Sequence, residues 1–132
     1  HTLNAFTAVN PDGTLHLVGG TPGANIQVQT NLQLIINVVD LKMNVQEATE
    51  APRWQHLNAP GQSSSEETGS GVLEIENRIS TKVLDQLRTK GHDVKELAAW
   101  GHGSSVQLMQ VLPNKTYAFG SDPRCEGHAS GI

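Results

Sequence analysis

A run of turn-forming residues stands directly in front of the longest apolar helix pattern in this 132-residue sequence. Glycines at positions 19, 20 and 23 allow a sharp turn and a close approach of the backbone to another group. The first amide N–H groups of a helix have no partner inside it, so they can receive negative charge. The pattern therefore has three interpretations: an anion-binding turn, a turn that stabilises the oxyanion of acyl transfer, or a structural corner.

The other residue types that often carry chemistry are scattered along the chain. The six histidines form no close ligand pair, and Cys125 has no second cysteine for a metal motif or an internal disulfide. We therefore predict no metal site and no cofactor. Arg53 and Arg124 each follow a proline, and we expect both to make structural ion pairs or hydrogen bonds to carbonyls, with Asp122 as a partner for either one.

Apolar spacing predicts the elements that position the glycine-rich turn. The sequence Asn-Pro-Asp-Gly at 10–13 is a strong turn signal between two short apolar stretches, so the chain opens with a β-hairpin. After the turn at 19–23, helical periodicity predicts a helix from about 24 to 41 that is buried on more than one side. Asn44 and Glu47 form a capping-box pattern for a second, short helix.

The remainder of the chain adds a loop and further elements of both kinds. Residues 58–70 are rich in Ser, Gly, Asn and Glu without apolar periodicity, which predicts a flexible surface loop. The other predicted elements are a strand at 72–75, a helix that Ser80 or Thr81 caps and Gly91 closes, and a second hairpin at 106–112 and 116–120. This order indicates the α+β class, with an antiparallel sheet covered by helices.

Composition and length limit the classes of function. A net charge of −4 argues against nucleic acid as a main partner, and no apolar run approaches the ~18 residues of a membrane span. We expect residues 1–132 to form a single partial domain, cut from something longer, because the sequence begins with His1 on the edge of an apolar pattern. The predicted long helix has too little partner surface in this chain alone. The compartment is not indicated.

Three motifs, in order along the chain, resemble the second half of the small subunit of the gamma-glutamyltransferase (gamma-glutamyltranspeptidase) family. The first is "GTPGANIQVQTNLQLIINVVDLKMNVQEATEAPRW" at 20–54, which is similar to the family's Gly-Ser/Thr-Pro-Gly-Gly turn, helix and following Asp-to-Arg stretch. The second is "LRTKGHDV" at 87–94, and the third is "GSDPRCEGHASG" at 120–131. Together these motifs extend over most of the chain.

The resemblance implies an N-terminal nucleophile hydrolase with a four-layer αββα sandwich. Such a precursor cuts itself, and the newly exposed threonine attacks an amide carbonyl to form an acyl-enzyme, which passes its acyl group to water or an amine. The backbone amides of Gly23 and Ala24 match the family's oxyanion donors. The implied partners are the large subunit or remaining segment of the same precursor and a small amide substrate, with a higher oligomer also open.

The resemblance also shows departures that bear on the substrate. The family's nucleophilic threonine lies upstream of the matching region, and Thr2 is a poor candidate because His1 precedes it. Thr2 and Leu3 occupy the places of two serines that grip the substrate carboxylate in gamma-glutamyl enzymes, which favours the acylase-like and small-amide hydrolase branch. We assign substrate binding to Thr2, Leu3, Gly20 and Thr21. A non-catalytic binding subunit with the same fold is the alternative.

Overall fold

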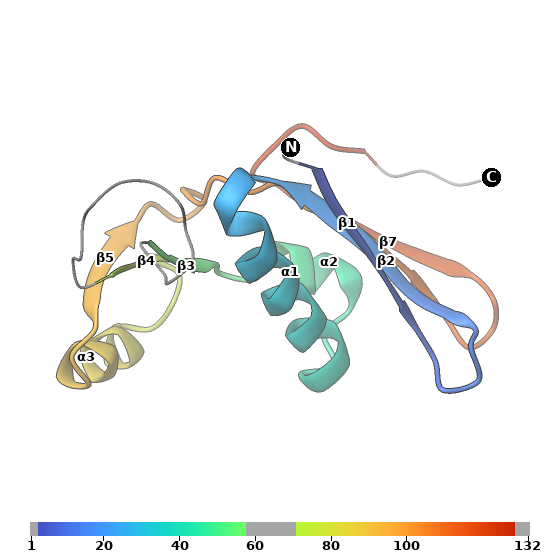
Figure 1. Cartoon of the computed structure of the whole chain (residues 1–132), viewed down its shortest axis with the longest axis horizontal. Coiled ribbons are helices and arrows are strands. Elements are labelled where there is room, and N and C mark those ends of the chain that lie inside the picture. Colours follow the sequence, from blue (N-terminus) through green and yellow to red (C-terminus); the bar gives the residue numbers. More distant parts are fainter. Residues whose placement is uncertain (1–2, 58–70, 129–132) are drawn as a thin grey trace. The chain divides into compact units, whose positions relative to one another are not determined.

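The computed structural model describes residues 3–57 and 71–128. The chain divides into two compact units, the first made of the residues up to 51 and from 103 onward, and the second made of 52–102. Each unit has its own sheet and its own helices (Figure 1). The loop predicted at 58–70 lies outside the described residues.

The first unit is a four-stranded antiparallel sheet with helices on one face. The strand order is β1-β2-β6-β7, and each neighbouring pair is antiparallel. The helices lie together on the same side of this sheet (Figure 1), as the sequence predicts. The elements are β1 (Leu3–Val9), β2 (Leu15–Pro22), a 3-10 turn η1 (Ala24–Ile26), α1 (Gln27–Ile35), a π-helical turn η2 (Ile36–Asp40), α2 (Val45–Glu50), β6 (Gln107–Val111) and β7 (Tyr117–Ser121).

Strand β2 is longer than the sequence analysis predicts. Residues 19–22, expected to be part of the turn, continue the strand and pair with β1. Gly19 and Gly20 are required in the strand for steric reasons. A Cβ on Gly19 would lie 2.6 Å from Leu108 Cδ1, and one on Gly20 would lie 2.6 Å from the carbonyl oxygen of Asn4. The turn is therefore confined to Gly23 and Ala24.

The core of the first unit lies between the sheet and the helices. It comprises the buried side chains of Leu17, Leu34, Val38, Val45, Ala48, Val106 and Leu108. The predicted helix from 24 to 41 is present as the continuous series η1, α1 and η2. It is not buried on more than one side within the described residues, because Val28 is 70% exposed and Leu32 is 51% exposed. The expectation that this chain offers the helix too little partner surface agrees with this exposure.

Helix α2 begins at the capping box that the sequence predicts. The Asn44 side chain accepts from the amide of Glu47 at 2.9 Å, and the Glu47 carboxylate accepts from the amide of Asn44 at 3.1 Å. Gln46 then joins the helix to β7, because its side-chain amide bonds both the N–H and the carbonyl of Ser121 at 3.0 Å. These contacts fix the short helix against the end of the sheet.

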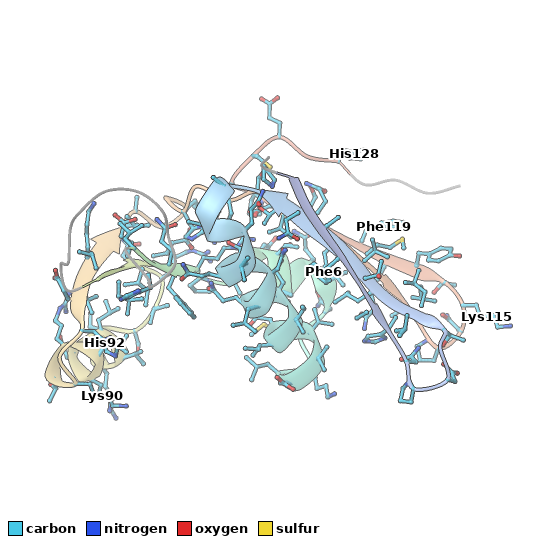
Figure 2. The ribbon with its side chains drawn as sticks, viewed as in Figure 1. Phe6, Lys90, His92, Lys115, Phe119 and His128 are labelled. Atoms are coloured by element: carbon cyan, nitrogen blue, oxygen red, sulfur yellow. The ribbon has the colours of Figure 1, made fainter. Side chains whose placement is uncertain are left out.

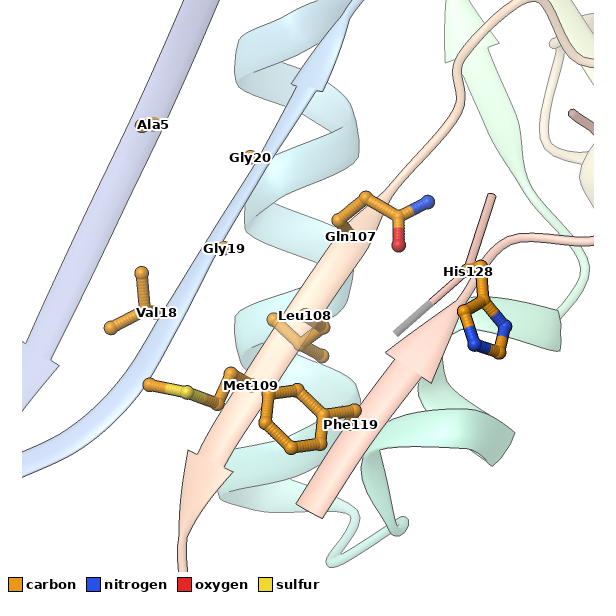
Figure 3. Close-up of a pocket in the computed structure, with 9 residues that line it drawn as sticks. All are labelled: Ala5, Val18, Gly19, Gly20, Gln107, Leu108, Met109, Phe119 and His128. Atoms are coloured by element: carbon orange, nitrogen blue, oxygen red, sulfur yellow. The ribbon is translucent and has the colours of Figure 1, made fainter. Parts of the chain in front are cut away.

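The face of the sheet away from the helices is apolar and uncovered within the described part of the chain. Alternation along the strands places Phe6 toward the helices and Phe119 away from them (Figure 2). On the uncovered face, Val18, Met109 and Phe119 line a shallow depression together with Gln107 and His128 (Figure 3). We call this surface the open face.

The second unit differs in its topology. Its sheet has the order β3-β4-β5, with β3 and β4 antiparallel but β4 and β5 parallel. The predicted antiparallel sheet is confirmed in the first unit, and the parallel pair β4–β5 is an addition that the sequence analysis did not include; α3 forms the crossover that a parallel pair requires. The elements are β3 (Trp54–His56), β4 (Val72–Glu76), α3 (Thr81–Thr89) and β5 (Asp93–Leu97), of which β3 and β5 were not predicted. Gly91 follows α3 with a φ of 92°, as expected for the residue that closes a helix.

A fully buried carboxylate organises the second unit. Glu76 accepts hydrogen bonds from the amide of Arg53 at 3.1 Å, from the amide of His102 at 3.2 Å and from Arg78 Nη2 at 2.8 Å. The Arg78 guanidinium also lies 3.6 Å from the centre of the Trp100 ring.

Within the described residues, no helix of either unit is long and apolar enough to cross a bilayer.

Candidate functional site

The turn between β2 and the long helix has an unusual backbone. Gly23 has a φ of 137° and Ala24 has a φ of 48°, so two consecutive residues lie in the region that disfavours L side chains. Gly23 is required for a second reason, because a Cβ there would lie 2.8 Å from Ile26 Cγ1. The sequence pattern thus identified the turn, and the structure restricts its special conformation to two residues.

The amides of Gly23 and Ala24 make no hydrogen bond to any other group in residues 3–57 and 71–128. The helix begins with a 3-10 turn in which Ile26 N donates to Gly23 O at 3.1 Å. Pro22 has no N–H, so Gly23 is the first donor after the strand. Ala24 is exposed and Gly23 is half-buried. The pair has the chemistry of an oxyanion or anion site.

Several predicted site residues come together at this turn. Because β1 and β2 are antiparallel, the start of β1 lies at the end of β2, and Leu3 pairs with Pro22 while Ala5 pairs with Gly20. The assignment of substrate binding to Leu3 and Gly20 stays a prediction. Thr2 lies outside the described residues.

Thr21 is buried directly before the turn. Its side chain is 3% exposed, and its hydroxyl donates to the carbonyl oxygen of Pro22 at 2.6 Å. The same hydroxyl accepts from the amide of Ser105 at 3.2 Å. Ser105, 84 positions further along the chain, was missed in the sequence analysis because no local pattern marks it.

A buried ion pair ties the closing segment of the chain to the end of α2. Arg124 pairs with Asp122 at 3.0 Å and donates to the carbonyl oxygens of Thr49 and Ala51 at 3.1 and 3.0 Å. Asp122 in turn accepts from the amide of Val106 at 2.9 Å. Both charged side chains are almost fully buried. This confirms the prediction that Arg124 is structural and pairs with Asp122.

A hollow of about 500 Å³ lies beside the turn on the first unit. Its lining combines the ends of β1 and β2 with the closing segment: Asn4, Ala5, Gly20, Thr21, Pro22, Ser105, Gln107, Cys125 and Glu126. The exposed thiol of Cys125 and the Glu126 carboxylate were not assigned to a site from the sequence. In the described part of the chain, no group of three His, Cys, Asp or Glu side chains is arranged to hold a metal ion.

Comparisons with known proteins place the chain in a family. The family described as Gamma-glutamyltranspeptidase matches residues 1–132. A glutathione hydrolase proenzyme of Escherichia coli is 36% identical over 118 residues, which cover 89% of this chain and 18% of that protein. An oxamate amidohydrolase proenzyme of Klebsiella pneumoniae is 33% identical over 135 residues, which cover 99% of this chain and 24% of that protein.

Solved structures agree with the sequence relatives. A mutant gamma-glutamyltranspeptidase of Helicobacter pylori aligns with a TM-score of 0.76 at 28% identity, covering 93% of this chain and 61% of that one. The chain therefore belongs to the gamma-glutamyltranspeptidase family, and the predicted N-terminal nucleophile hydrolase fold is confirmed. It spans about a fifth to a quarter of the length of these two curated relatives, 18% and 24% respectively.

Proposed function

We propose that the protein is an amide-cleaving acyl-transfer enzyme whose nucleophilic threonine is carried by a segment upstream of this chain. In this proposal the chain supplies the oxyanion turn and half of the catalytic core. The upstream threonine attacks the amide carbonyl, its free amine serves as base, and the resulting acyl-enzyme is resolved by water or by an amine. The proposal rests on membership in the family together with one feature of the site.

That feature is the pair of amides at Gly23 and Ala24. Two adjacent donors, with no partner among the described residues, directly follow Pro22, a residue at the end of β2 that lines the hollow. An oxyanion hole needs donors that are already oriented where charge develops in the transition state. Hydrogen bonds to the carbonyl oxygens of Pro22 and Gly23, from the Thr21 hydroxyl at 2.6 Å and from Ile26 N at 3.1 Å, support such preorganisation of the two peptide groups.

The substrate we propose is a γ-glutamyl group or another small acyl group in amide linkage. Leu3 stands where gamma-glutamyl enzymes have a carboxylate-binding serine, and a leucine side chain has no donor to offer. The Klebsiella relative is named for oxamate, a small amide, and it matches nearly the whole chain. Both observations favour a small amide over a strict γ-glutamyl substrate.

The proposed partner is the remaining part of the same precursor, docked on the open face. The matching relatives are proenzymes, of which this chain covers a minor share. A sheet with one face packed on helices and the other apolar is half of a four-layer sandwich, and a second sheet from the partner completes it. A higher oligomer stays a prediction.

The test is to express the precursor with its upstream segment and follow its maturation. We expect two chains by intact mass, a threonine at the new amino terminus, and hydrolysis of small-acyl anilides by the matured form. Incubation with substrate at low pH should trap a mass increase of one acyl group on the threonine-bearing chain. A precursor that stays uncut and releases no aniline from γ-glutamyl or small-acyl anilides would leave only the non-catalytic alternative.

A further inference from the structure

The two peptide groups at the turn are each held at their carbonyl end. The carbonyl of Pro22 accepts from the hydroxyl of Thr21 at 2.6 Å, and the carbonyl of Gly23 accepts from Ile26 N at 3.1 Å. A trans peptide is planar, with its C=O and N–H pointing in opposite directions, and the described chain has no cis peptide. Fixing each carbonyl therefore fixes the direction of the N–H that follows it.

The two peptide groups are held by different means. The Gly23–Ala24 peptide is held by a backbone bond that belongs to the start of the helix. The Pro22–Gly23 peptide is held by a side chain, and that side chain is itself tied to a distant segment through Ser105 N at 3.2 Å. The result is a chain of bonds from Ser105 through Thr21 to the peptide that carries the Gly23 N–H.

We propose that Thr21 is a positioning residue that aims the Gly23 amide at the substrate carbonyl. This inference rests on the proposed function, because it assigns the orientation of one of the two proposed oxyanion donors. Thr21 does not touch the substrate in this account. Its only hydroxyl proton is committed to the carbonyl of Pro22, and its side chain is 3% exposed.

The surroundings of Thr21 strengthen the effect. Ser104 and Val106 on the adjoining segment are almost fully buried, so the Thr21 hydroxyl is shielded from water. Hydrogen bonds in such surroundings are electrostatically stronger than in water. A carbonyl that accepts a short hydrogen bond polarises its own peptide group, which makes the N–H of that peptide a better donor. Thr21 thus both orients the Gly23 amide and increases its attraction for a developing oxyanion.

Two other roles for Thr21 predict different results. If the hydroxyl contacted the substrate, as the sequence analysis assigned, its removal would raise KM as well as lower kcat. If Thr21 only filled space, stability would follow side-chain volume, and turnover would not depend on the hydroxyl. Positioning of the donor instead predicts a loss confined to kcat, because the oxyanion exists only in the transition state.

Three variants of the matured enzyme, compared with wild type in two matched pairs, separate the hydroxyl from the rest of the side chain. Thr21→Val keeps the branched shape and removes the hydroxyl, whereas Thr21→Ser keeps the hydroxyl and removes the methyl. Thr21→Ala differs from Thr21→Ser only in lacking the hydroxyl. Comparison of these two variants therefore tests the role of the hydroxyl even if Thr21→Val does not fold. We expect Thr21→Val and Thr21→Ala to lower kcat about tenfold or more with KM within about threefold, and Thr21→Ser to stay within about threefold of wild type. Melting temperatures are measured for all four proteins.

An amide readout makes the test independent of catalysis. Labelling with carbonyl-¹³C proline and ¹⁵N glycine selects Pro–Gly peptides, of which this sequence has Pro22–Gly23 and Pro60–Gly61. Loss of the hydroxyl in Thr21→Val or Thr21→Ala should shift or broaden the Gly23 resonance, while Thr21→Ser preserves it. The Gly61 resonance should stay unchanged in all variants and serves as the internal control.

The outcomes separate the inference from the proposed function. Loss of kcat together with a displaced Gly23 resonance supports both. Unchanged kcat in folded Thr21→Val or Thr21→Ala, or a loss that appears only in KM, overturns the inference and leaves the proposed function standing. If the wild-type enzyme cleaves no amide, the proposed function fails, and an unmoved Gly23 resonance would overturn the positioning role as well.

Discussion

The two units of the chain differ in what their sheets present to the surroundings. In the first unit the open face carries Val18, Met109 and Phe119 in a row of apolar side chains. In the second unit the edge strand β5 carries charges that are paired, Lys95 with Glu74 at 2.8 Å and Glu96 with Arg88 at 2.7 Å. Paired charges of this kind are typical of a surface that stays exposed to solvent. The apolar side chains on the open face of the first unit indicate that another layer covers this face.

The units also use buried charge differently. In the first unit the Asp122–Arg124 pair joins the closing segment to the end of α2. In the second unit Glu76 gathers two backbone amides and one arginine around itself. Buried charge thus joins segments 73 and 75 positions apart in the first unit, but only 23 and 26 positions apart in the second. This difference leads to four predictions, which follow from the largest expected effect to the smallest.

A charge on the open face should prevent assembly with the rest of the precursor. Phe119→Asp removes an aromatic contact and forces a carboxylate into the interface, which we expect to cost more than about 4 kcal/mol. Copurification of the two chains after co-expression measures the effect. The matched control is Val83→Asp on α3, because Val83 and Phe119 are similarly exposed, at 41% and 39%. Equal loss of complex in both variants would contradict a special role for the open face.

Breaking the buried ion pair of the first unit should destabilise the assembled enzyme strongly. Asp122→Ala leaves the Arg124 guanidinium buried without its carboxylate and removes the acceptor of the Val106 amide, at an expected cost of about 3–5 kcal/mol. Thermal or denaturant unfolding measures the loss. As control, Glu96→Gln removes a half-exposed pair of the second unit and should cost less than about 1 kcal/mol. Similar losses would mean that the buried pair is no more important than a surface pair.

Relieving the backbone at Ala24 should stabilise the protein slightly. Its φ of 48° disfavours an L residue by roughly 1 kcal/mol, so Ala24→Gly removes that strain while retaining the amide. The gain is reduced because glycine also raises the entropy of the unfolded chain. We expect a neutral to stabilising change of at most about 1 kcal/mol with turnover preserved. A large loss of activity would show that the Ala24 methyl group contacts the substrate.

The ion pair of Glu74 should make a small, pH-dependent contribution. The hydrogen bond from Lys95, followed by that from Gln55, lowers the pKa of Glu74 below its usual value. A lowered pKa in the folded state stabilises the protein above the unfolded pKa of about 4.3, and this stabilisation is lost as the pH falls through the folded pKa. Glu74→Gln should therefore cost less than about 1 kcal/mol near pH 7, because Lys95 is largely exposed. The free energies of unfolding of the variant and the wild type should converge as the pH falls. If they diverge instead, the ionised Glu74 carboxylate does not stabilise the folded state.

Local signals predicted much of the first unit. The turn at 10–13, the Asn44–Glu47 capping box and the hairpin of β6 and β7 all depend on neighbours within a few residues, and each occurs in the structure. Strands β3 and β5 were missed because they are short and polar, and they exist through pairing with β4. The extension of β2 through Gly19 was missed for a related reason, since glycines suggest a turn unless a neighbouring strand approaches closely.

The candidate site was predictable only in part. The glycine at 23 marks the turn in the sequence, and the resemblance to a family assigns a role to its amides. The part played by Ser105 depends on a contact across 84 positions, which no local pattern encodes. The conformation of the turn could not be predicted either: Gly23 has a φ of 137°, so Gly23→Pro would distort the turn as well as remove the N–H, because proline requires a φ near −65°.

Replacing the turn amides by esters tests the central claim most directly. Glycolic acid at position 23 or lactic acid at position 24, introduced by nonsense suppression, removes one N–H with little change of shape. We predict that each ester lowers kcat of the matured enzyme by about 100- to 1000-fold, with KM nearly unchanged. An ester at Gly13, whose amide donates to Asn10 in a hairpin turn, should lower stability slightly and leave kcat intact. Near-normal turnover with an ester at either turn position would contradict the assignment of that amide to the oxyanion.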